Sequence, residues 1–403
     1  MRNLLFLAHR IPYPPNKGDK IRSWNFLLRL ADEYRVHVGC FVDDPHDWQY
    51  TGEIDRLAAS SCFRPLRRRP ALLRSLGGLA TGDPLTVGYY RDAPLKKWIA
   101  ELAATTEIER VFVFSSSMIQ YVPDALAREA RVLVDFVDVD SDKWRQYAEK
   151  KSWPASWIYA REARTLLGVE RRGAAKVDAS TFVSEDEAKL FRTLAPESAG
   201  RIFGLTHGVD CEKFDPALDF ASPFGRDGRH IVFTGAMDYW ANADAVTWFA
   251  EDILPRIRTA APDARFWIVG ANPGADVTRL GALPGVAVTG RVEDVRPYIR
   301  HAAVSVAPLR VARGIQNKVL EAMAMAKATV ATPEAIEGIE AEHDREVIVA
   351  DGPGAFAEGV VRLLSGEEAA AMGAAARARV IRSHGWTASF RSLVSLLEGD
   401  AAT

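Results

Sequence analysis

Lys318 and Glu321 are the two residues whose types and spacing most favour ligand chemistry. They lie three positions apart, so a helix presents both on one face. Gly314 precedes them in a loop, and the unpaired amides and the positive end of a helix dipole face such a loop. A cation beside aligned amides suits a diphosphate, and a carboxylate one turn further along suits the hydroxyls of a ribose. The pattern predicts a nucleotide-linked ligand. The alternative is a buried helix in which Glu321 only caps or forms an ion pair.

The elements that must position this pair are a strand, a helix and a second strand within Ser305 to Thr332. The sequence predicts strands at Val304 to Ala307 and Thr329 to Ala331, because both are short apolar runs. It predicts a helix from about Lys318 to Ala326 between them. A strand that leads into a helix across a glycine loop is typical of α/β domains.

The beginning of the chain has the same alternation. Leu4 to Ala8 is an apolar run expected to be a buried strand, and Val36 to Val42 is the next. Between them, the proline-rich loop His9 to Asp19 cannot be helical, and a helix is predicted from about Lys20 to Asp32. This βαβ unit lacks the G-x-G-x-x-G turn, which argues against a dinucleotide cofactor.

Polar residues follow two later strands of this half. Ser115 comes after Val111 to Phe114, and Asp138 and Asp140 come after Val132 to Val137. The carboxyl ends of parallel strands are where α/β domains place their chemistry. Asp138 and Asp140 are therefore candidates to orient or deprotonate an acceptor hydroxyl. Helix capping or a salt bridge is the competing interpretation for each.

The bulk composition sets broad limits. A chain of 403 residues predicts two or three domains. The net charge of -2 predicts no general attraction to nucleic acid. Three widely spaced cysteines provide neither a disulfide framework nor a metal-binding pattern, and they favour a reducing cytoplasm. The apolar run at the N-terminus is too short for a signal peptide.

A basic stretch extends from Phe63 to Lys97 and has interleaved leucines. Cations beside apolar side chains suit the face of an anionic bilayer, with roughly 1 kcal/mol from each basic residue near the surface. A solvated loop and helix is the alternative. A cluster of aromatic and basic residues from Lys143 to Arg161 has two interpretations as well: a membrane or sugar platform, or packing between helices. Pro154 must divide any helix in that cluster.

The alternation restarts after a turn-rich segment at Thr206 to Asp210, so a domain boundary is expected near residue 206. Strands are predicted at Ile231 to Thr234, Arg265 to Val269, Val286 to Thr289 and Val347 to Ala350. Helices are predicted at Ala243 to Ile257, Ala355 to Leu364 and Glu367 to Ser383. We therefore expect two domains, and the family resemblance given below implies their roles: acceptor binding for 1–205, donor binding for 206–385, and a C-terminal helix (386–403) that returns to the first domain.

The run Gly314 to Lys318 followed by Leu320-Glu321-Ala322-Met323-Ala324 resembles the donor-binding segment of retaining glycosyltransferases of family 4. Gly208, Val209, Asp210, Phe214 and Pro216 match a second segment of that family, at the entry to its donor domain. The chain looks most similar to the sugar transferases of bacterial PEP-CTERM/exosortase exopolysaccharide loci. This resemblance implies the GT-B fold: two Rossmann-like, doubly wound α/β domains that face each other across a cleft.

The resemblance also implies roles for individual residues. Glu321 matches the glutamate that holds the ribose, and Lys318 is expected to neutralise the leaving diphosphate. Gly290-Arg291-Val292 resembles the turn that packs on the base, although a plain turn after a strand is the alternative. The full set of expected donor-binding residues is Gly18, Gly235, Arg291, Val292, Arg310, Gly314, Ile315, Gln316, Asn317, Lys318 and Glu321.

Three departures from the family pattern concern the same sites. The family has a second glutamate eight positions before Glu321, where this chain has Arg313. It often has Arg and Lys after the first strand of the donor domain, and Gly235 to Trp240 contains neither, so Lys318 and Arg310 are expected to supply that charge. Gly18 matches the family's glycine pair near the reacting phosphates, while Asp19 replaces the second glycine; a simple turn is the alternative for Gly18.

Acceptor binding is assigned to Asp19, Arg22 and Ser115, with a solvated surface charge as the alternative for Arg22. Catalytic roles are assigned to Asp138, Asp140 and Lys318. Asp138-Val139-Asp140 resembles a metal motif of another glycosyltransferase fold, but the GT-B pattern implies a reaction with no metal and no cofactor.

The resulting hypothesis is a retaining transfer of sugar from a nucleotide-diphosphate sugar to a glycan or polyprenyl-diphosphate-linked acceptor in exopolysaccharide or cell-envelope biosynthesis. The protein is expected in the cytoplasm, on the anionic inner membrane surface through Arg64–Lys97, with no nucleic acid partner. Two rival functions are a sugar-nucleotide epimerase, which needs no acceptor, and a non-catalytic module that binds sugar nucleotides.

Overall fold

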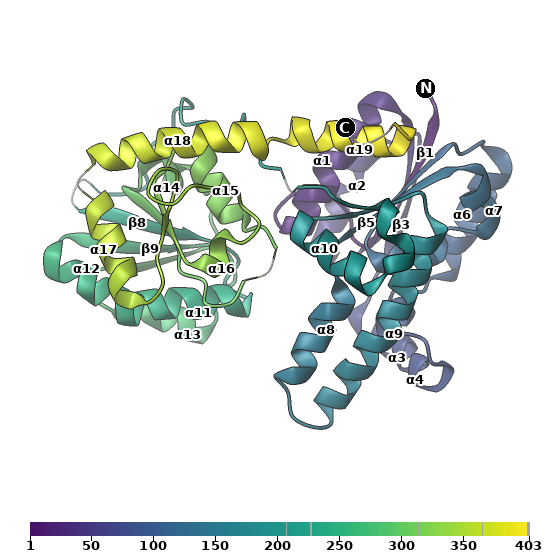
Figure 1. Cartoon of the computed structure of the whole chain (residues 1–403), viewed down its shortest axis with the longest axis horizontal. Coiled ribbons are helices and arrows are strands. Elements are labelled where there is room, and N and C mark those ends of the chain that lie inside the picture. The colour runs from purple at the N-terminus through teal and green to yellow at the C-terminus, as the bar shows by residue number, and fades with distance from the viewer. Residues whose placement is uncertain (207, 226–227, 313, 365, 401–403) are drawn as a thin grey trace. The chain divides into compact units, whose positions relative to one another are not determined.

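The computed structural model describes residues 1–206, 208–225, 228–312, 314–364 and 366–400, and the chain divides into two compact units (Figure 1). The first unit comprises Met1–Thr206 with Ser389–Thr403, and the second comprises His207–Ala388. Each unit contains one sheet whose paired strands are all parallel. Within the described residues, none of the helices has the length and apolarity needed to cross a bilayer.

The sheet of the first unit has the strand order β3-β2-β1-β4-β5-β6-β7. Its strands are β1 (Asn3–Ala8), β2 (Arg35–Val42), β3 (Ser60–Pro65), β4 (Arg110–Phe114), β5 (Arg131–Val137), β6 (Ala179–Phe182) and β7 (Ile202–Gly204). The strand order reverses between β1 and β4, which makes this a doubly wound sheet with its switch point there. Ligands of such sheets bind outside the carboxyl ends of the strands at that point.

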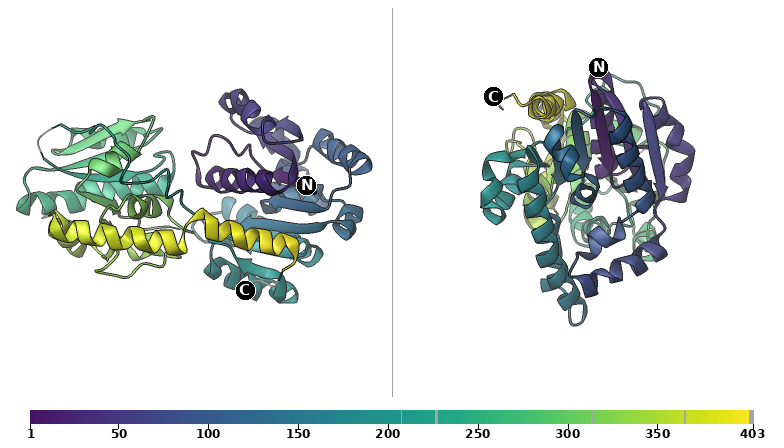
Figure 2. Two further views of the ribbon diagram at one scale, coloured as in Figure 1. Left: turned by 90° about the horizontal axis from the view of Figure 1, so that it is seen from above. Right: turned by 90° about the vertical axis from the view of Figure 1, so that its right-hand side faces the viewer.

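The helices of the first unit include one long antiparallel pair, α8 and α9, which projects beyond the sheet (Figures 1 and 2). The α-helices are α1 (Gly18–Glu33), α2 (Thr51–Asp55), α3 (Arg68–Leu76), α4 (Gly78–Thr81), α5 (Leu85–Tyr89), α6 (Ala93–Thr105), α7 (Asp124–Glu129), α8 (Asp140–Glu149), α9 (Ala155–Lys176) and α10 (Glu185–Leu194). Shorter 3-10 turns lie at Pro45–Tyr50, Ser116–Tyr121 and Pro196–Arg201.

The second unit repeats the same plan, with the strand order β10-β9-β8-β11-β12-β13. Its strands are β8 (Arg229–Thr234), β9 (Ala264–Val269), β10 (Val286–Gly290), β11 (Val304–Ala307), β12 (Thr329–Ala331) and β13 (Ile348–Val349). Its α-helices are α11 (Trp240–Trp248), α12 (Leu254–Ala260), α13 (Ala275–Arg279), α14 (Arg296–His301), α15 (Asn317–Ala324), α16 (Pro333–Ile336), α17 (Pro353–Leu363) and α18 (Glu367–Ser383). The reversal lies between β8 and β11, so these two strands flank the switch point.

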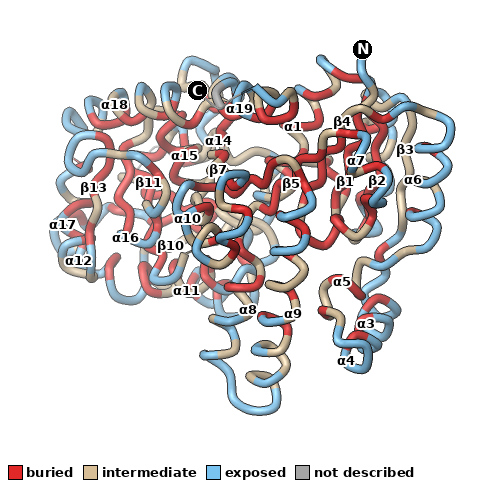
Figure 3. The backbone as a smooth tube through the Cα atoms, turned by 45° about the vertical axis from the view of Figure 1, so that its right-hand side comes forward, coloured by how far each residue is buried: buried red, intermediate tan, exposed pale blue. Residues whose placement is uncertain are grey.

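The cores form because the central strands are continuous apolar runs, and Figure 3 shows them as buried. Leu4, Leu5, Phe6, Leu7 and Ala8 of β1 are all 0% exposed. Burying such side chains gives roughly 25 cal/mol for each Å² of apolar surface removed from water. The predicted doubly wound sheets follow from this burial on both faces.

One predicted helix is divided in the structure. We predicted a single helix from Ala243 to Ile257, but a π turn at Phe249–Ile253 separates α11 from α12. Pro255 explains the break, because a proline has no N–H to donate to the preceding turn. The predicted apolar face is nevertheless buried, since Val246, Phe249, Ile253 and Ile257 are 0% exposed.

The last helix, α19 (Trp386–Glu398), contacts the first unit through its C-terminal part. Glu398 at its end pairs with Arg2 and with Arg110, the latter at 2.8 Å from Arg110 Nη2 to Glu398 Oε2. Arg131 Nε donates to the carbonyl of Leu396 at 2.9 Å. These contacts fix the end of the chain beside the amino ends of β1, β4 and β5.

Candidate active site

Lys318 and Glu321 lie in the first turns of α15, which follows the carboxyl end of β11. Lys318 Nζ lies 5.4 Å from the centroid of the Phe233 ring, and Phe233 belongs to β8. It also donates to Gln316 Oε1 at 3.3 Å. The cation therefore stands at the switch point between β8 and β11, where a doubly wound sheet binds its ligand.

Burial shifts the pKa values of both side chains. Burial lowers the pKa of Lys318 to about 8, against the opposing charge of Glu321. Burial raises the pKa of Glu321 to about 7, although the charges of Lys213 and Lys318 oppose this. No ion pair of either side chain is found among the described residues. A partly buried cation and carboxylate without ion-pair partners are stabilised when a ligand supplies an opposite charge or a hydrogen bond.

The loop before α15 is held in place from two sides. Thr332 Oγ1, at the end of β12, donates to the carbonyl of Leu309 at 2.6 Å and accepts from Ala335 N. Gln316 Nε2 donates to the carbonyl of Gly314 at 3.0 Å. Gly314 has φ +62°, a left-handed conformation that costs a glycine little. The amides that begin α15 are thereby aimed across the loop, as an anion site requires.

The remaining predicted residues of this loop have separate places. Ile315 packs against the core of the second unit, and Asn317 is the first residue of α15. Gly235 follows β8, and a Cβ at Gly270 would lie 1.7 Å from its carbonyl oxygen, so two loops approach backbone to backbone. This close approach keeps the carboxyl ends of β8 and β9 together.

Arg310 and the turn after β10 contact other groups than Lys318. Arg310 Nε donates to Asp244 Oδ2 at 3.0 Å, and its guanidinium lies 5.5 Å from the Trp248 ring. Arg291 is exposed, while Val292 packs against a small cluster that includes Trp267. The structure therefore pairs the Arg310 charge with a carboxylate of α11 and leaves Lys318 as the cation beside Glu321.

The segment that resembles the family's entry to the donor domain has a structural role here. A Cβ at Gly208 would lie 2.6 Å from Trp386 Cδ2, so only glycine fits against that ring. Asp210 Oδ1 accepts from Lys213 N at 2.8 Å, and Phe214 is buried in the core. Arg377 of α18 donates to the carbonyls of Phe214 (3.0 Å) and Ala324, which connects this segment to the end of α15.

In the first unit, Asp138 and Asp140 lie at the carboxyl end of β5 and the start of α8. Both contact the same ammonium: Lys143 Nζ is 2.6 Å from Asp138 Oδ2 and 3.4 Å from Asp140 Oδ1. Burial opposes the protonated form of Lys143, but the two carboxylates raise its pKa above the usual value. Ser116 Oγ donates to Asp140 Oδ2 at 3.3 Å. The predicted carboxylates are thus together, in the salt bridge that was the competing interpretation for each of them.

Ser115, Gly18 and Asp19 lie at the neighbouring strand ends. Ser115 follows β4 with φ +85°, and Gly18 is the first residue of α1, which begins two residues earlier than predicted. Asp19 Oδ2 lies 2.6 Å from Arg10 Nη1 and 3.4 Å from His9 Nε2. Burial would raise the pKa of Asp19, but the hydrogen bond to His9 and the charge of Arg10 hold it well below the usual range.

Arg22 does not take the place predicted for it at an acceptor. Its side chain is 0% exposed and pairs with Asp135 of β5, with Nε 2.6 Å from Oδ2. Thr181 Oγ1 also donates to Asp135 Oδ1, at 3.1 Å. The sequence analysis gave Arg22 two interpretations, an acceptor contact and a solvated surface charge, because it could not see a carboxylate 113 residues away. The structure makes Arg22 a buried connection between α1 and the sheet.

Sequence reasoning missed His9, Arg10, Lys143, Lys213 and Arg377. His9, Arg10 and Lys143 lie within ten residues of their partners, so local spacing was a signal that could have found them. Lys213 and Arg377 act on groups far away in the chain and become visible only in the folded unit. Arg313, which stands where the family has its other glutamate, lies outside the described residues.

Comparisons with known proteins agree with this architecture. Residues 228–366 match the family model described as glycosyl transferases group 1. No curated protein matches the chain by sequence. Among solved structures, a glycosyltransferase from Rickettsia africae is 13% identical with a TM-score of 0.67, and the match covers 99% of this chain and 98% of that one.

Two further solved structures are similar over their whole lengths. HepE of Anabaena, solved with UDP and glucose, is 14% identical with a TM-score of 0.66, and the match covers 99% of this chain and 100% of that one. The sucrose-phosphate synthase of Thermosynechococcus elongatus is 15% identical with a TM-score of 0.70, with 99% of each chain covered. These neighbours and the two doubly wound sheets confirm the predicted GT-B fold. The match of residues 228–366 to the glycosyl transferases group 1 model indicates a glycosyltransferase enzyme.

Proposed function

We propose that this glycosyltransferase moves a sugar, with retention of configuration, from a nucleotide-diphosphate sugar to a lipid-linked glycan acceptor in exopolysaccharide or cell-envelope biosynthesis. The reaction uses no metal and no cofactor. The resemblance to sugar transferases of PEP-CTERM/exosortase loci supports the pathway, and HepE, whose structure contains UDP and glucose, supports the donor class.

The observation that carries the proposal is the placement of Lys318 and Glu321 on α15 at the switch point of the second sheet. Negative charge develops on the diphosphate as its bond to the sugar breaks. Lys318 and the amides of Gly314 to Asn317 stabilise that charge, which is the usual largest contribution of an enzyme to such a step. Glu321 accepts hydrogen bonds from the ribose hydroxyls and thereby fixes the position of the donor.

The acceptor side uses the carboxyl ends of β1, β4 and β5 in the first unit. Asp138 and Asp140 bracket Lys143 there, and Ser115 and Asp19 lie at the two neighbouring strand ends. In the proposal, a carboxylate of this group orients the acceptor hydroxyl, and Lys143 holds the two carboxylates in place. Burial and the Asp19 ion pairs keep the surrounding loop rigid.

The proposed place of action is the inner face of the cytoplasmic membrane. Arg67, Arg68 and Arg69 are exposed at the start of α3, and Leu72, Leu73 and Leu76 are 48%, 71% and 52% exposed on the same helix. Cations at the amino end of a helix are unfavourable for the helix itself, because the dipole is positive there. An anionic bilayer compensates them and accepts the leucines, as the basic stretch predicts.

Calorimetric titration with UDP, GDP and ADP tests the donor site. One nucleotide is expected to bind, and Glu321→Ala is expected to weaken it by about 1–3 kcal/mol, as for a hydrogen bond to a charged group. Glu334→Ala, at an exposed carboxylate of α16, is the matched control and should bind like the wild type. No binding of any nucleotide, or equal losses in both variants, would overturn the proposal.

A further inference from the structure

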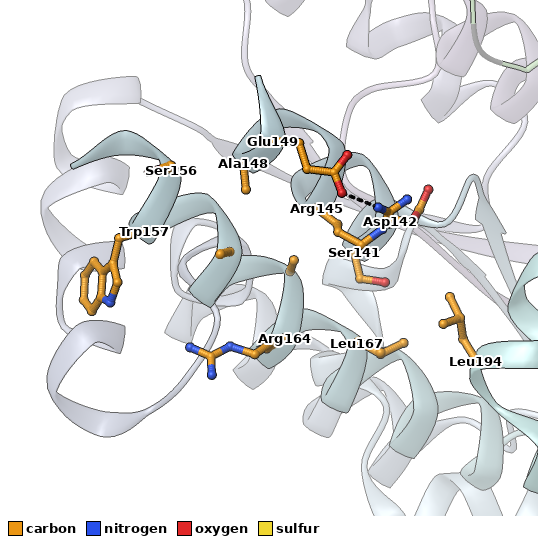
Figure 4. A pocket seen from close by; sticks show the side chains of 12 residues that line it. Ser141, Asp142, Arg145, Ala148, Glu149, Ser156, Trp157, Arg164, Leu167 and Leu194 are labelled. Carbon is orange, nitrogen blue, oxygen red and sulfur yellow. Dashed lines mark hydrogen bonds and ion pairs between the residues drawn. The ribbon is translucent and has the colours of Figure 1, made fainter. Parts of the chain in front are cut away.

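A cavity of about 580 Å³ lies between α8 and α9 of the first unit (Figure 4). This volume falls in the range of roughly 300–1,000 Å³ that small-molecule sites occupy. The faces of the two helices that line it follow helical spacing, as with Ser141, Arg145 and Ala148 on α8. We call it the hairpin groove.

The groove is deep because its walls carry small side chains. Ala148, Ala160 and Ala163 line it where larger residues would close the gap between two packed helices. Leu167 and Leu194 line one end, and Trp157 stands at the other end, as Figure 4 shows. A groove walled by alanine and leucine accepts a hydrocarbon chain more readily than a sugar or a nucleotide, because it offers few hydrogen-bond partners.

Four charged side chains surround the apolar walls. Arg145 is engaged: its Nε lies 2.6 Å from Asp142 Oδ1 and its Nη1 lies 2.6 Å from Glu149 Oε1. Arg164 is exposed, and none of the described residues forms an ion pair or hydrogen bond with its guanidinium. The acidic residues at the groove are thus satisfied by Arg145, while Arg164 is available to an anion carried by the occupant.

One end of the groove lies at the predicted acceptor chemistry. Ser141 and Asp142 line the groove and directly follow Asp140 in the first turn of α8. From there, the ten residues of α8 lead away from the sheet for about 15 Å. A ligand with its polar head near Asp138 and Asp140 would therefore direct its tail along the hairpin.

The other end of the groove lies at an exposed aromatic tip. Trp157 and Trp153 are 56% and 81% exposed, and Lys150 and Lys151 are exposed beside them. Large exposed aromatics and lysines together are typical of a lipid–water interface. The hairpin tip thus has the composition of a surface from which a lipid chain enters.

The tip belongs to the same body as the basic surface of α3. Arg161 of α9 donates to the carbonyl of Gly78 at 2.6 Å, and Glu162 accepts from the backbone N–H groups of Leu85 (2.7 Å) and Thr86 (2.8 Å). These contacts attach the α3–α5 segment to α9. The groove, the aromatic tip and the arginines of α3 are therefore held in one rigid part of the first unit.

We infer that the hairpin groove binds the isoprenoid chain of the lipid-linked acceptor, with Arg164 contacting its phosphate-bearing head and Trp157 bordering the chain where it enters. This inference rests on the proposed function and names the part of the acceptor that the enzyme holds. The occupant combines an apolar chain with an anion, which matches alanine and leucine walls beside a free guanidinium.

Farnesyl phosphate, a short isoprenoid with one phosphate, is the probe. Its binding to the full chain is measured by calorimetry below its micelle concentration. Ala160→Phe fills the groove from an exposed position of α9, so the fold is retained; the matched control is Ala175→Phe, exposed further along the same helix. We expect at least a tenfold loss of affinity in Ala160→Phe and no change in Ala175→Phe.

A second pair of variants tests the charge. Arg164→Gln is expected to weaken farnesyl phosphate by about fivefold and to leave farnesol unchanged, since farnesol has no anion. Arg172→Gln, at another exposed arginine of α9, should affect neither. Equal affinity of Ala160→Phe and Ala175→Phe would overturn the inference, and so would tighter binding of lysophosphatidylglycerol than of farnesyl phosphate, which would assign the groove to a membrane phospholipid.

Nucleotide binding is measured on the same variants, so that a failure of the groove inference can be distinguished from a failure of the proposed function. Ala160→Phe should bind the nucleotide as the wild type does, because α15 belongs to the other unit. A chain that binds farnesyl phosphate in the groove but no nucleotide would contradict the proposed function while supporting the groove. A chain that binds nucleotide but no farnesyl phosphate would overturn the groove alone.

Discussion

The two regions for which we predicted chemistry, β11–α15 in the second unit and β5–α8 in the first, are built differently. At β11–α15, a strand, a loop and a helix within about thirty residues bring Lys318 and Glu321 together, and the sequence displays the arrangement directly. At β5–α8, the arrangement depends on partners far apart in the chain. Arg22 pairs with Asp135 across 113 residues, and the backbone N–H of Val139 donates to Glu187 across 48 residues.

The difference concerns how much of each charge is already satisfied. Lys318 and Glu321 have no ion-pair partner among the described residues, and burial shifts both pKa values towards the neutral forms. Asp138, Asp140 and Asp19 each contact a cation within 3.4 Å. The pair at β11–α15 is therefore stabilised most by an incoming ligand. At β5–α8 the carboxylates already have cations, and a ligand must replace one of these contacts to bind.

Removing Arg22 should have the largest effect. Arg22→Ala leaves the carboxylate of Asp135 buried without its cation, and breaking such a pair costs about 3–5 kcal/mol in the free energy of unfolding. Urea denaturation of the first unit, followed by hydrogen exchange of its strands, measures this. The double variant Arg22→Met/Asp135→Leu should be much less destabilised. A loss below about 1 kcal/mol in Arg22→Ala would favour the alternative interpretation of the arginine, a solvated surface charge.

Binding to anionic vesicles should show the next largest effect. Replacing Arg67, Arg68 and Arg69 by Ser is expected to weaken sedimentation with phosphatidylglycerol vesicles by up to about 3 kcal/mol, or roughly a hundredfold, from about 1 kcal/mol for each cation. The control replaces three scattered, exposed arginines of the same unit, Arg29, Arg128 and Arg172. If both triple variants lose the same affinity, the effect is one of net charge and the α3 surface is not the contact.

The affinity for nucleotide should depend on pH through Lys318. The free site holds the pKa of Lys318 at about 8, and a diphosphate beside the ammonium must raise it. Binding therefore takes up a proton above pH 8, and affinity should fall by up to roughly tenfold for each further pH unit. Calorimetry in two buffers of different ionisation enthalpy counts that proton. Lys318→Met should abolish the uptake, and its persistence in this variant would assign the proton to another group.

The smallest expected effect concerns the loop before α15. Thr332→Val removes the hydroxyl that donates to the carbonyl of Leu309, which is buried, and should cost the second unit about 1 kcal/mol of stability. Thermal unfolding with and without nucleotide measures it. Thr259→Val, at an exposed threonine of α12, is the control. An unchanged melting temperature in both variants would mean that the loop does not depend on this tether.

The predictable part of the fold was the buried part. The strands at Val304–Ala307 and Thr329–Ala331 agree with the prediction to the residue, because central parallel strands are unbroken apolar runs. Ser60–Pro65 and Ile202–Gly204 were not predicted, since both are edge strands and lack such runs. The π turn at Phe249–Ile253 was hidden as well, because the apolar spacing continues through it.

The same distinction applies to the candidate site. Glu321 could be proposed from its spacing to Lys318, and Lys143 stands at the same spacing from Asp140. The partner of Arg22, by contrast, lies 113 residues away. Arg22 was misplaced because a lone arginine early in a helix usually faces water. The groove between α8 and α9 was invisible for a related reason: alanines at helical spacing indicate packing, and only the assembled hairpin shows that several of them line an open groove.

The most direct test of the donor site is hydrogen–deuterium exchange with and without the nucleotide that binds most tightly. We predict slower exchange in the peptides that cover residues 314–325 and unchanged exchange over α8. Protection confined to the first unit, or none in residues 314–325 at saturating nucleotide, would contradict the assignment of Lys318 and Glu321 to the donor.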